Sequence, residues 1–187
     1  METPSPLNST DQPKHRRAIL LSIAGVAAGV GAGLYWWNQQ PAVATAGFSP
    51  VDGFWDLEWD TPDGAKLLVR SFQGKPILLN FWATWCPPCV EELPLLDAFY
   101  RENRSKGWQV LGLAVDKAGA VRSFLEKMPL SFPIAMAGLG GVDLGRNLGN
   151  VTGGLPFSVA ITKNGEIAQR KMGRLGVADL EAWRSLK

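Results

Sequence analysis

Histidine is nearly absent from this sequence, and cysteine is scarce. The single histidine, His15, lies near the N-terminus, so the rest of the chain lacks the side chain that most often acts as general base and metal ligand. The two cysteines, Cys86 and Cys89, are too few for a structural zinc site, which takes four Cys or His ligands. They also lie too close together in the sequence to close a long loop, so pairing them adds little stability. A chemical role therefore explains the pair better than a structural one.

The chain also has no large excess of positive or negative charge. The formal net charge is only +2, charged residues make up 19% of the chain and hydrophobic residues 46%. A nucleic-acid-binding domain carries a basic face with interleaved aromatic side chains, and no dense basic stretch follows the N-terminal tail. The composition favours a globular core and no nucleic-acid partner.

An uncharged run near the N-terminus predicts a membrane-spanning helix. Residues 18–37 contain no charged side chain and follow a basic cluster at residues 14–17. A helix of this length spans roughly 30 Å, the thickness of a bilayer core. Basic residues before the run orient the N-terminus to the inside, and the aromatic residues 35–37 suit the outer interface.

This pattern predicts four parts: a cytoplasmic tail (residues 1–17), a transmembrane anchor or uncleaved signal (18–37), a linker (38–50) and a folded domain (51–187) outside the cell membrane, facing the periplasm or cell exterior. The alternative is a signal peptide cleaved near Ala44-Thr45-Ala46, which would leave a soluble periplasmic domain. With either an anchor or a cleaved signal peptide, the domain is expected to be exported.

Apolar runs and turn signals divide the domain into alternating strands and helices. We expect strands at 54–59, 67–69, 77–83, 108–115 and 132–136, and a hairpin of 157–162 and 166–172 around Asn164-Gly165. We expect helices at 86–103, 121–127, 144–148 and 177–186, and a glycine-rich loop at 138–141. This order predicts an α/β fold with a mixed central sheet flanked by helices.

The chemistry is concentrated where the central strand meets the next helix. The apolar strand delivers Cys86 to the helix N-terminus, where the helix dipole favours a thiolate. Cys89 lies one turn further along the same face and is expected to be less exposed. Cys86 is therefore the candidate nucleophile and Cys89 the candidate resolving thiol.

These residues resemble a known family. The segment from Phe81 to Cys89 reads FWATWCPPC and is followed by Glu92-Leu93-Pro94. It resembles the thioredoxin superfamily and, more narrowly, membrane-anchored thiol–disulfide oxidoreductases of the TlpA/ResA/CcmG type. The resemblance covers roughly residues 54–186 and implies a thioredoxin-like fold.

The resemblance also gives further residues a role. Pro156 matches the cis-proline of the superfamily, which leaves the Leu155 backbone free to pair with a substrate; Trp85, Leu155 and Pro156 are the expected substrate-binding residues. Asn80 stands where thioredoxin has a buried aspartate. Glu92 matches an acidic residue of the TlpA/ResA branch, and we expect it to take the proton of Cys89, its pKa raised by partial burial.

Two prolines between the cysteines favour a reductant. Pro87 and Pro88 carry no N–H to stabilise the Cys86 thiolate, so the reduced form is not strongly favoured. The resemblance implies disulfides of exported proteins as substrates, apocytochrome c thiols among them, and a membrane thiol transporter of the DsbD/CcdA type as electron donor. Thiol exchange requires no cofactor and no metal.

Alternative functions remain at this stage. A peroxiredoxin-like peroxidase needs the spacing T-x-x-C, but Thr84 precedes Cys86 by two positions. A Sco-type copper module needs a histidine, which the predicted domain lacks. An oxidising or isomerising disulfide catalyst would reverse the electron flow, and a purely structural domain would keep the cysteines as a permanent staple.

Overall fold

The computed structural model describes residues 53–186. The predictions for residues 1–17, 18–37 and 38–50 concern residues outside this range. Among the described residues, no helix is long and apolar enough to cross a membrane.

One mixed sheet organises the described part of the chain. Its strands are β1 (Glu58–Asp60), β2 (Lys66–Leu68), β3 (Ile77–Trp82), β4 (Gln109–Ala114), β5 (Ile134–Met136), β6 (Phe157–Ile161) and β7 (Ile167–Met172). They lie in the order β2-β1-β5-β4-β3-β6-β7. The strands β3, β4 and β5 run parallel to one another, whereas β1 is antiparallel to β5 and β6 is antiparallel to β3. The predicted mixed sheet is confirmed.

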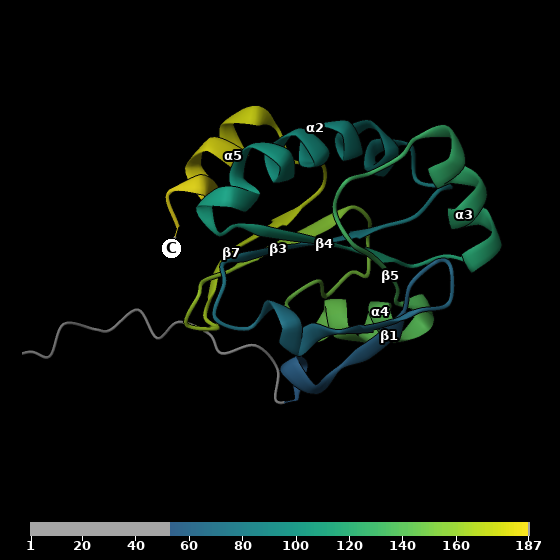
Figure 1. Cartoon of the computed structure of the whole chain (residues 1–187), viewed down its shortest axis with the longest axis horizontal. Coiled ribbons are helices and arrows are strands. Elements are labelled where there is room, and N and C mark those ends of the chain that lie inside the picture. The colour runs from purple at the N-terminus through teal and green to yellow at the C-terminus, as the bar shows by residue number, and fades with distance from the viewer. Residues whose placement is uncertain (1–52, 187) are drawn as a thin grey trace, which may run out of the picture. The chain divides into compact units, whose positions relative to one another are not determined.

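Helices cover both faces of this sheet (Figure 1). The helices are α2 (Pro87–Asn103), α3 (Ala118–Lys127), α4 (Gly138–Asn147) and α5 (Val177–Arg184), with short 3₁₀ turns η1 (Phe54–Asp56), η2 (Val69–Phe72) and η3 (Arg104–Lys106). Buried side chains of α2, α3 and α5 pack on one face in a cluster that includes Cys86 and Cys89, here called the disulfide-side cluster. Side chains of α4, η1 and η2 pack on the other face.

The strand β3 lies between β4 and β6 and is buried along its whole length. Its side chains alternate between the two faces: Leu78 and Trp82 join the disulfide-side cluster, and Leu79 and Phe81 join the opposite one. A strand covered by helices on both faces reads as a continuous apolar run. Asn80 is the one polar residue in this strand, and it points to the side of Leu78 and Trp82 because side chains repeat every second residue.

The predicted strand at 54–59 is wrong in its first half. Phe54 to Asp56 form the turn η1, and extended structure begins at Glu58. The turn follows Gly53, whose φ of 79° lies in the left-handed region that glycine adopts freely. It directs the ring of Phe54 into the core, 1% exposed, with Trp55 packed edge-on against it.

The predicted glycine-rich loop at 138–141 is also wrong, because these residues form the first turn of α4. A Cβ added at Gly141 would lie 2.6 Å from the Cβ of Ala137 and 3.3 Å from Cγ2 of Val115. Here the glycine permits close packing of a helix and does not mark a loop. The helix predicted at 144–148 is the second half of the same element.

The remaining elements lie close to their predicted positions. The hairpin of β6 and β7 closes with the Gly165 N–H donating to the Thr162 carbonyl at 2.9 Å. The turn before β2 is closed in the same way by Gly64 and Thr61, again at 2.9 Å. Boundaries differ by a few residues; α3, for example, begins at Ala118 and not at Val121.

A glycine in β4 provides a test of the packing in the disulfide-side cluster. A Cβ at Gly112 would lie 2.6 Å from Cδ1 of Ile134 and 3.1 Å from Nε1 of Trp82, both in the core. We expect Gly112→Ala to lower the free energy of unfolding by about 1–3 kcal/mol through overpacking, measured by urea denaturation.

The matched control is Gly119→Ala in α3. The nearest atom to its added Cβ is 4.0 Å away, so this change should raise stability by about 0.5–1 kcal/mol through helix propensity. Equal effects of the two substitutions would contradict the packing argument.

Candidate active site

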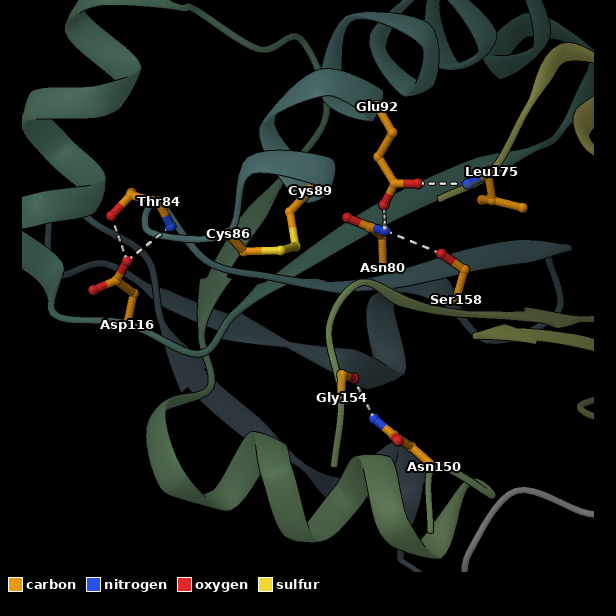
Figure 2. The surroundings of a disulfide bond; sticks show 10 residues. All are labelled: Asn80, Thr84, Cys86, Cys89, Glu92, Asp116, Asn150, Gly154, Ser158 and Leu175. Carbon is orange, nitrogen blue, oxygen red and sulfur yellow. Dashed lines mark hydrogen bonds between the residues drawn. A yellow bond between two sulfur atoms is a disulfide. The ribbon is translucent and has the colours of Figure 1, made fainter. Parts of the chain in front are cut away.

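Two cysteines meet where β3 passes into α2. Cys86 is the residue that precedes the first turn of α2, and its sulfur forms a disulfide with Cys89 across a Cα–Cα distance of 5.3 Å (Figure 2). Cys86 is 5% exposed and Cys89 is 0% exposed. The cysteine that retains some solvent exposure is therefore the predicted nucleophile, and the fully buried one is the predicted resolving cysteine.

The N-terminus of α2 is poor in hydrogen-bond donors. Pro87 and Pro88 occupy its first two positions, and neither has an N–H. The next two N–H groups, of Cys89 and Val90, both donate to the Cys86 carbonyl, at 3.0 and 3.1 Å. A helix normally presents several free N–H groups at this end; here the first four positions offer none to the sulfur of Cys86.

An aspartate holds the loop that leads to the cysteines. Both the backbone N–H and the hydroxyl of Thr84 donate to Oδ2 of Asp116, at 2.8 and 2.6 Å (Figure 2). Burial acts to raise the pKa of Asp116, but these hydrogen bonds and that of the Lys117 N–H outweigh it and hold the pKa below its usual value. The neighbouring Trp85 is 66% exposed.

The predicted cis-proline is confirmed, since the Leu155–Pro156 bond is cis. Pro156 immediately precedes β6, which is antiparallel to β3, so it lies at the sheet edge where β3 ends and leads to Cys86. Leu155 is half-buried and packs against the disulfide-side cluster. The preceding loop is fixed by the Asn150 amide, whose Nδ2 donates to the Gly154 carbonyl at 2.8 Å (Figure 2).

Glu92 is buried one helical turn after Cys89. It is 1% exposed, and each of its carboxylate oxygens accepts a hydrogen bond. Asn80 Nδ2 donates to Oε1 at 2.7 Å, and the Leu175 N–H donates to Oε2 at 2.7 Å (Figure 2). Asn80 Nδ2 also contacts the hydroxyl oxygen of Ser158 at 3.0 Å.

Burial raises the pKa of Glu92 above its ordinary value of 4.5. The Leu175 N–H, the Asn80 amide and the positive charges of Arg174 and Lys171 act in the opposite direction but do not cancel the burial. A carboxyl group with a raised pKa can take up and release protons closer to neutral pH than an exposed one.

The structure thus brings Cys86, Cys89 and Glu92 onto one end of α2, as expected. Sequence reasoning did not assign roles to Asp116, Asn150 or Ser158. The position of Asp116 at the end of a strand parallel to β3 was an available signal, because parallel strands end at the same edge of a sheet. Among the described residues, no group of three or more His, Cys, Asp or Glu side chains could hold a metal ion.

These features define a class of protein. A disulfide between cysteines separated by two residues, at the start of the helix after a central strand, and a cis-proline just before the adjacent antiparallel strand are features of a thioredoxin-like thiol–disulfide oxidoreductase. The chain belongs to the Redoxin family, whose model matches residues 52–182.

Known relatives agree with this class. The chain is 31% identical over 173 residues to the thiol-disulfide oxidoreductase ResA of Bacillus cereus (strain ATCC 10987 / NRS 248), covering 90% of this chain and 92% of the relative. A thiol:disulfide interchange protein of the thioredoxin family from Chlorobium tepidum TLS superposes with a TM-score of 0.62 at 27% identity, over 68% of this chain and 90% of that one.

A third relative is a secreted disulfide oxidoreductase of Mycobacterium tuberculosis, homologous to DsbE of E. coli. It superposes with a TM-score of 0.60 at 26% identity, over 72% of this chain and 98% of that one. The family and the CxxC pair identify this chain as a ResA-like thiol–disulfide oxidoreductase that works by dithiol exchange.

The raised pKa of Glu92 predicts a pH dependence of stability. Because the native state holds the Glu92 proton more tightly than the unfolded state, the free energy of unfolding falls as pH rises from the ordinary value of 4.5 through the raised pKa. We expect Glu92→Gln to lack this part of the fall.

The measurement is urea denaturation of the oxidised protein and of the variant at a series of pH values. Other titrating groups are common to both proteins, so their effects cancel in the difference. Parallel pH profiles for the two would refute the raised pKa.

Proposed function

We propose that this protein reduces disulfide bonds in exported proteins on the outer side of the cell membrane, with Cys86 as the nucleophile and Cys89 as the resolving thiol. The observation that carries the proposal is the placement of the disulfide at a helix N-terminus whose first two positions are prolines. This arrangement supports both thiol–disulfide exchange and the flow of electrons from this protein to its substrate.

The direction follows from the stability of the Cys86 thiolate. Strong oxidants of this fold owe their potential to a stabilised reduced form, and N–H groups at a helix N-terminus are one source of such stabilisation. Pro87 and Pro88 remove two of these groups, and the Cys86 carbonyl takes the next two. With little to stabilise its thiolate, the reduced protein gives up electrons readily.

The reaction balances in two exchanges. The Cys86 thiolate attacks one sulfur of a substrate disulfide, forms a mixed disulfide and releases the other substrate sulfur as a thiolate, which takes a proton from solvent. Cys89 then passes its proton to Glu92, and its thiolate attacks the Cys86 sulfur. This second exchange releases the second substrate sulfur as a thiolate, which takes a proton from solvent, and leaves the Cys86–Cys89 disulfide seen in the structure.

Substrate binding is assigned to Trp85, Leu155 and Pro156. The exposed ring of Trp85 offers an apolar contact next to Cys86, and 66% of it is accessible. The half-buried Leu155 precedes a proline that has no N–H and leads into β6. An extended substrate segment would pair with the backbone at Leu155, in the manner of strand addition to a sheet.

The proposed partners rest on the cysteine count and on the resemblance to the TlpA/ResA/CcmG type. Both cysteines of the chain are used in the disulfide, so the electrons that restore the dithiol come from another protein, for which we propose a membrane thiol transporter of the DsbD/CcdA type. Apocytochrome c thiols are the proposed substrate class. The uncharged run at residues 18–37 supports a single-pass membrane anchor, and the M. tuberculosis relative is described as secreted.

The reduction potential tests the direction of electron flow. We expect a value near or below about −270 mV, that of thioredoxin, when the full-length protein is equilibrated with dithiothreitol or glutathione buffers. A value near about −120 mV, typical of a strong oxidant, would reverse the proposed direction.

Replacing each cysteine in turn tests the two roles. Cys89→Ser should accumulate a mixed disulfide with an oxidised peptide substrate, because the resolving thiol is missing. Cys86→Ser, the matched control, should form little, because its remaining sulfur is 0% exposed. Mass spectrometry of the non-reduced products decides between them, and trapping by Cys86→Ser alone would exchange the roles.

A further inference from the structure

The carboxamide of Asn80 lies between two buried partners on the disulfide side of the sheet, the carboxyl group of Glu92 and the hydroxyl of Ser158. Its Nδ2 contacts Oε1 of Glu92 at 2.7 Å and Oγ of Ser158 at 3.0 Å. Asn80 and Ser158 are 0% exposed and Glu92 is 1% exposed. The carboxamide oxygen, Oδ1, is also buried and has no hydrogen-bond partner. An unpaired buried acceptor is costly, so its presence calls for a physical reason.

This arrangement suits only one charge state of Glu92. As a carboxylate, Glu92 only accepts hydrogen bonds, and both of its oxygens face N–H donors, those of Asn80 and Leu175. Once it takes a proton, the same group must also donate. Both of its partners would then be donors, and the new O–H would have no acceptor.

We propose that the Asn80 carboxamide turns by half a revolution about its Cβ–Cγ bond when Glu92 takes up a proton, so that Oδ1 accepts the new O–H of Glu92. Asn80 is then the positioning residue that allows Glu92 to exist in both charge states inside the core. The inference rests on the proposed role of Glu92 as proton acceptor for Cys89.

The two orientations of the amide make the same number of hydrogen bonds with Glu92 and Ser158. Before the turn, Nδ2 donates to Glu92 and to Ser158. After it, Oδ1 accepts from Glu92 and from the Ser158 hydroxyl, which can act as donor or acceptor. The amide has nearly the same shape in both orientations, so the surrounding side chains need not move.

The backbone holds the three side chains in place for this exchange. Asn80 of β3 and Ser158 of β6 are directly paired across the antiparallel strands, so their side chains leave the same face. Glu92 descends onto that face from α2, and Figure 2 shows its carboxyl group directed at the Asn80 amide.

The charged groups around Glu92 have partners of their own. Arg174 pairs with Glu91 at 2.8 Å, and Lys171 pairs with Asp179 at 2.6 Å. Leu175 contributes a backbone N–H that is a donor in every state. Among the described groups that contact the Glu92 carboxyl, only the Asn80 amide can change from donor to acceptor.

The test is a pH titration of the oxidised full-length protein by NMR. In the disulfide form neither cysteine titrates, so Glu92 changes charge alone within the buried cluster. The two readouts are the ¹³Cδ shift of Glu92 and the Nδ2 proton shifts of Asn80. We expect the Nδ2 protons to lose their hydrogen-bonded downfield shift as Glu92 is protonated, with the same midpoint pH.

The control is Glu92→Gln, in which the Nδ2 signals should not respond to pH over this range. If the Nδ2 protons of the parent keep their hydrogen-bonded shifts while the Glu92 ¹³Cδ titrates, the amide does not turn and the proposal is wrong.

Kinetics provide the second readout. We expect Asn80→Leu, which leaves Glu92 without this partner, to slow resolution of the mixed disulfide at least tenfold and to displace its pH profile. A purely structural role would lower stability and leave the pH profile unchanged, which would overturn the proposal.

The underlying proton acceptor role is tested separately, by the thiol-exchange rate of Glu92→Gln. If that variant exchanges thiols at the parental rate while the Nδ2 signals of the parent still follow Glu92, the amide reorientation stands and the proton acceptor role fails.

Discussion

The hydrogen bond between Asn80 and Glu92 is the constraint around which the site is organised. A carboxyl group buried in an apolar cluster is strongly unfavourable unless its oxygens are bonded. Here one bond comes from the middle of the central strand and the other from the backbone at Leu175. Together they tie α2, which begins at the disulfide, to the central strand and to the segment before α5.

Around this bond, each of the two loops that approach the disulfide is held by a hydrogen bond between a side chain and its backbone. Asp116 holds the backbone at Thr84, and Asn150 holds the carbonyl of Gly154. Functional residues on loops are held in place when the loops are attached to rigid helices and strands. These bonds restrict the backbone conformations of both loops, which lowers the conformational entropy that substrate binding would cost.

Most of the architecture was readable from local patterns. The apolar run of β3, the CPPC segment and the Asn164-Gly165 turn each carry a strong short-range signal, and the structure has a strand, a helix start and a hairpin at these places. The two errors came from glycine and phenylalanine. Gly141 lies in a helix and permits a close contact, but a glycine-rich segment in a sequence looks the same whether it forms a helix or a loop. Phe54 is buried from a 3₁₀ turn, so its apolar side chain does not mark a strand.

From the residues alone, the site was predictable only where its members are neighbours in the sequence, whereas Pro156 was assigned through the resemblance to the thioredoxin superfamily. The positions of Cys86, Cys89 and Glu92 follow from helical spacing alone. The pairing of Asn80 with Ser158 depends on the register of two strands joined through most of the domain, at a sequence separation of 78. Side-chain contacts of that range are set by tertiary structure, so Ser158 could not be assigned from the sequence.

The segment that leads from β7 into α5 has a wider consequence. The Gly173 N–H donates to the Pro156 carbonyl at 2.8 Å, and two residues later the Leu175 N–H donates to Glu92. Gly173 and Leu175 thus hold both the Pro156 carbonyl before β6 and the buried carboxyl group of Glu92. A shortened chain that ended before Gly173 would retain both cysteines and the whole of α2. Its Glu92, however, would lack the backbone N–H of Leu175 that donates to the carboxyl group. The redox centre therefore depends on residues far along the chain from the CPPC motif.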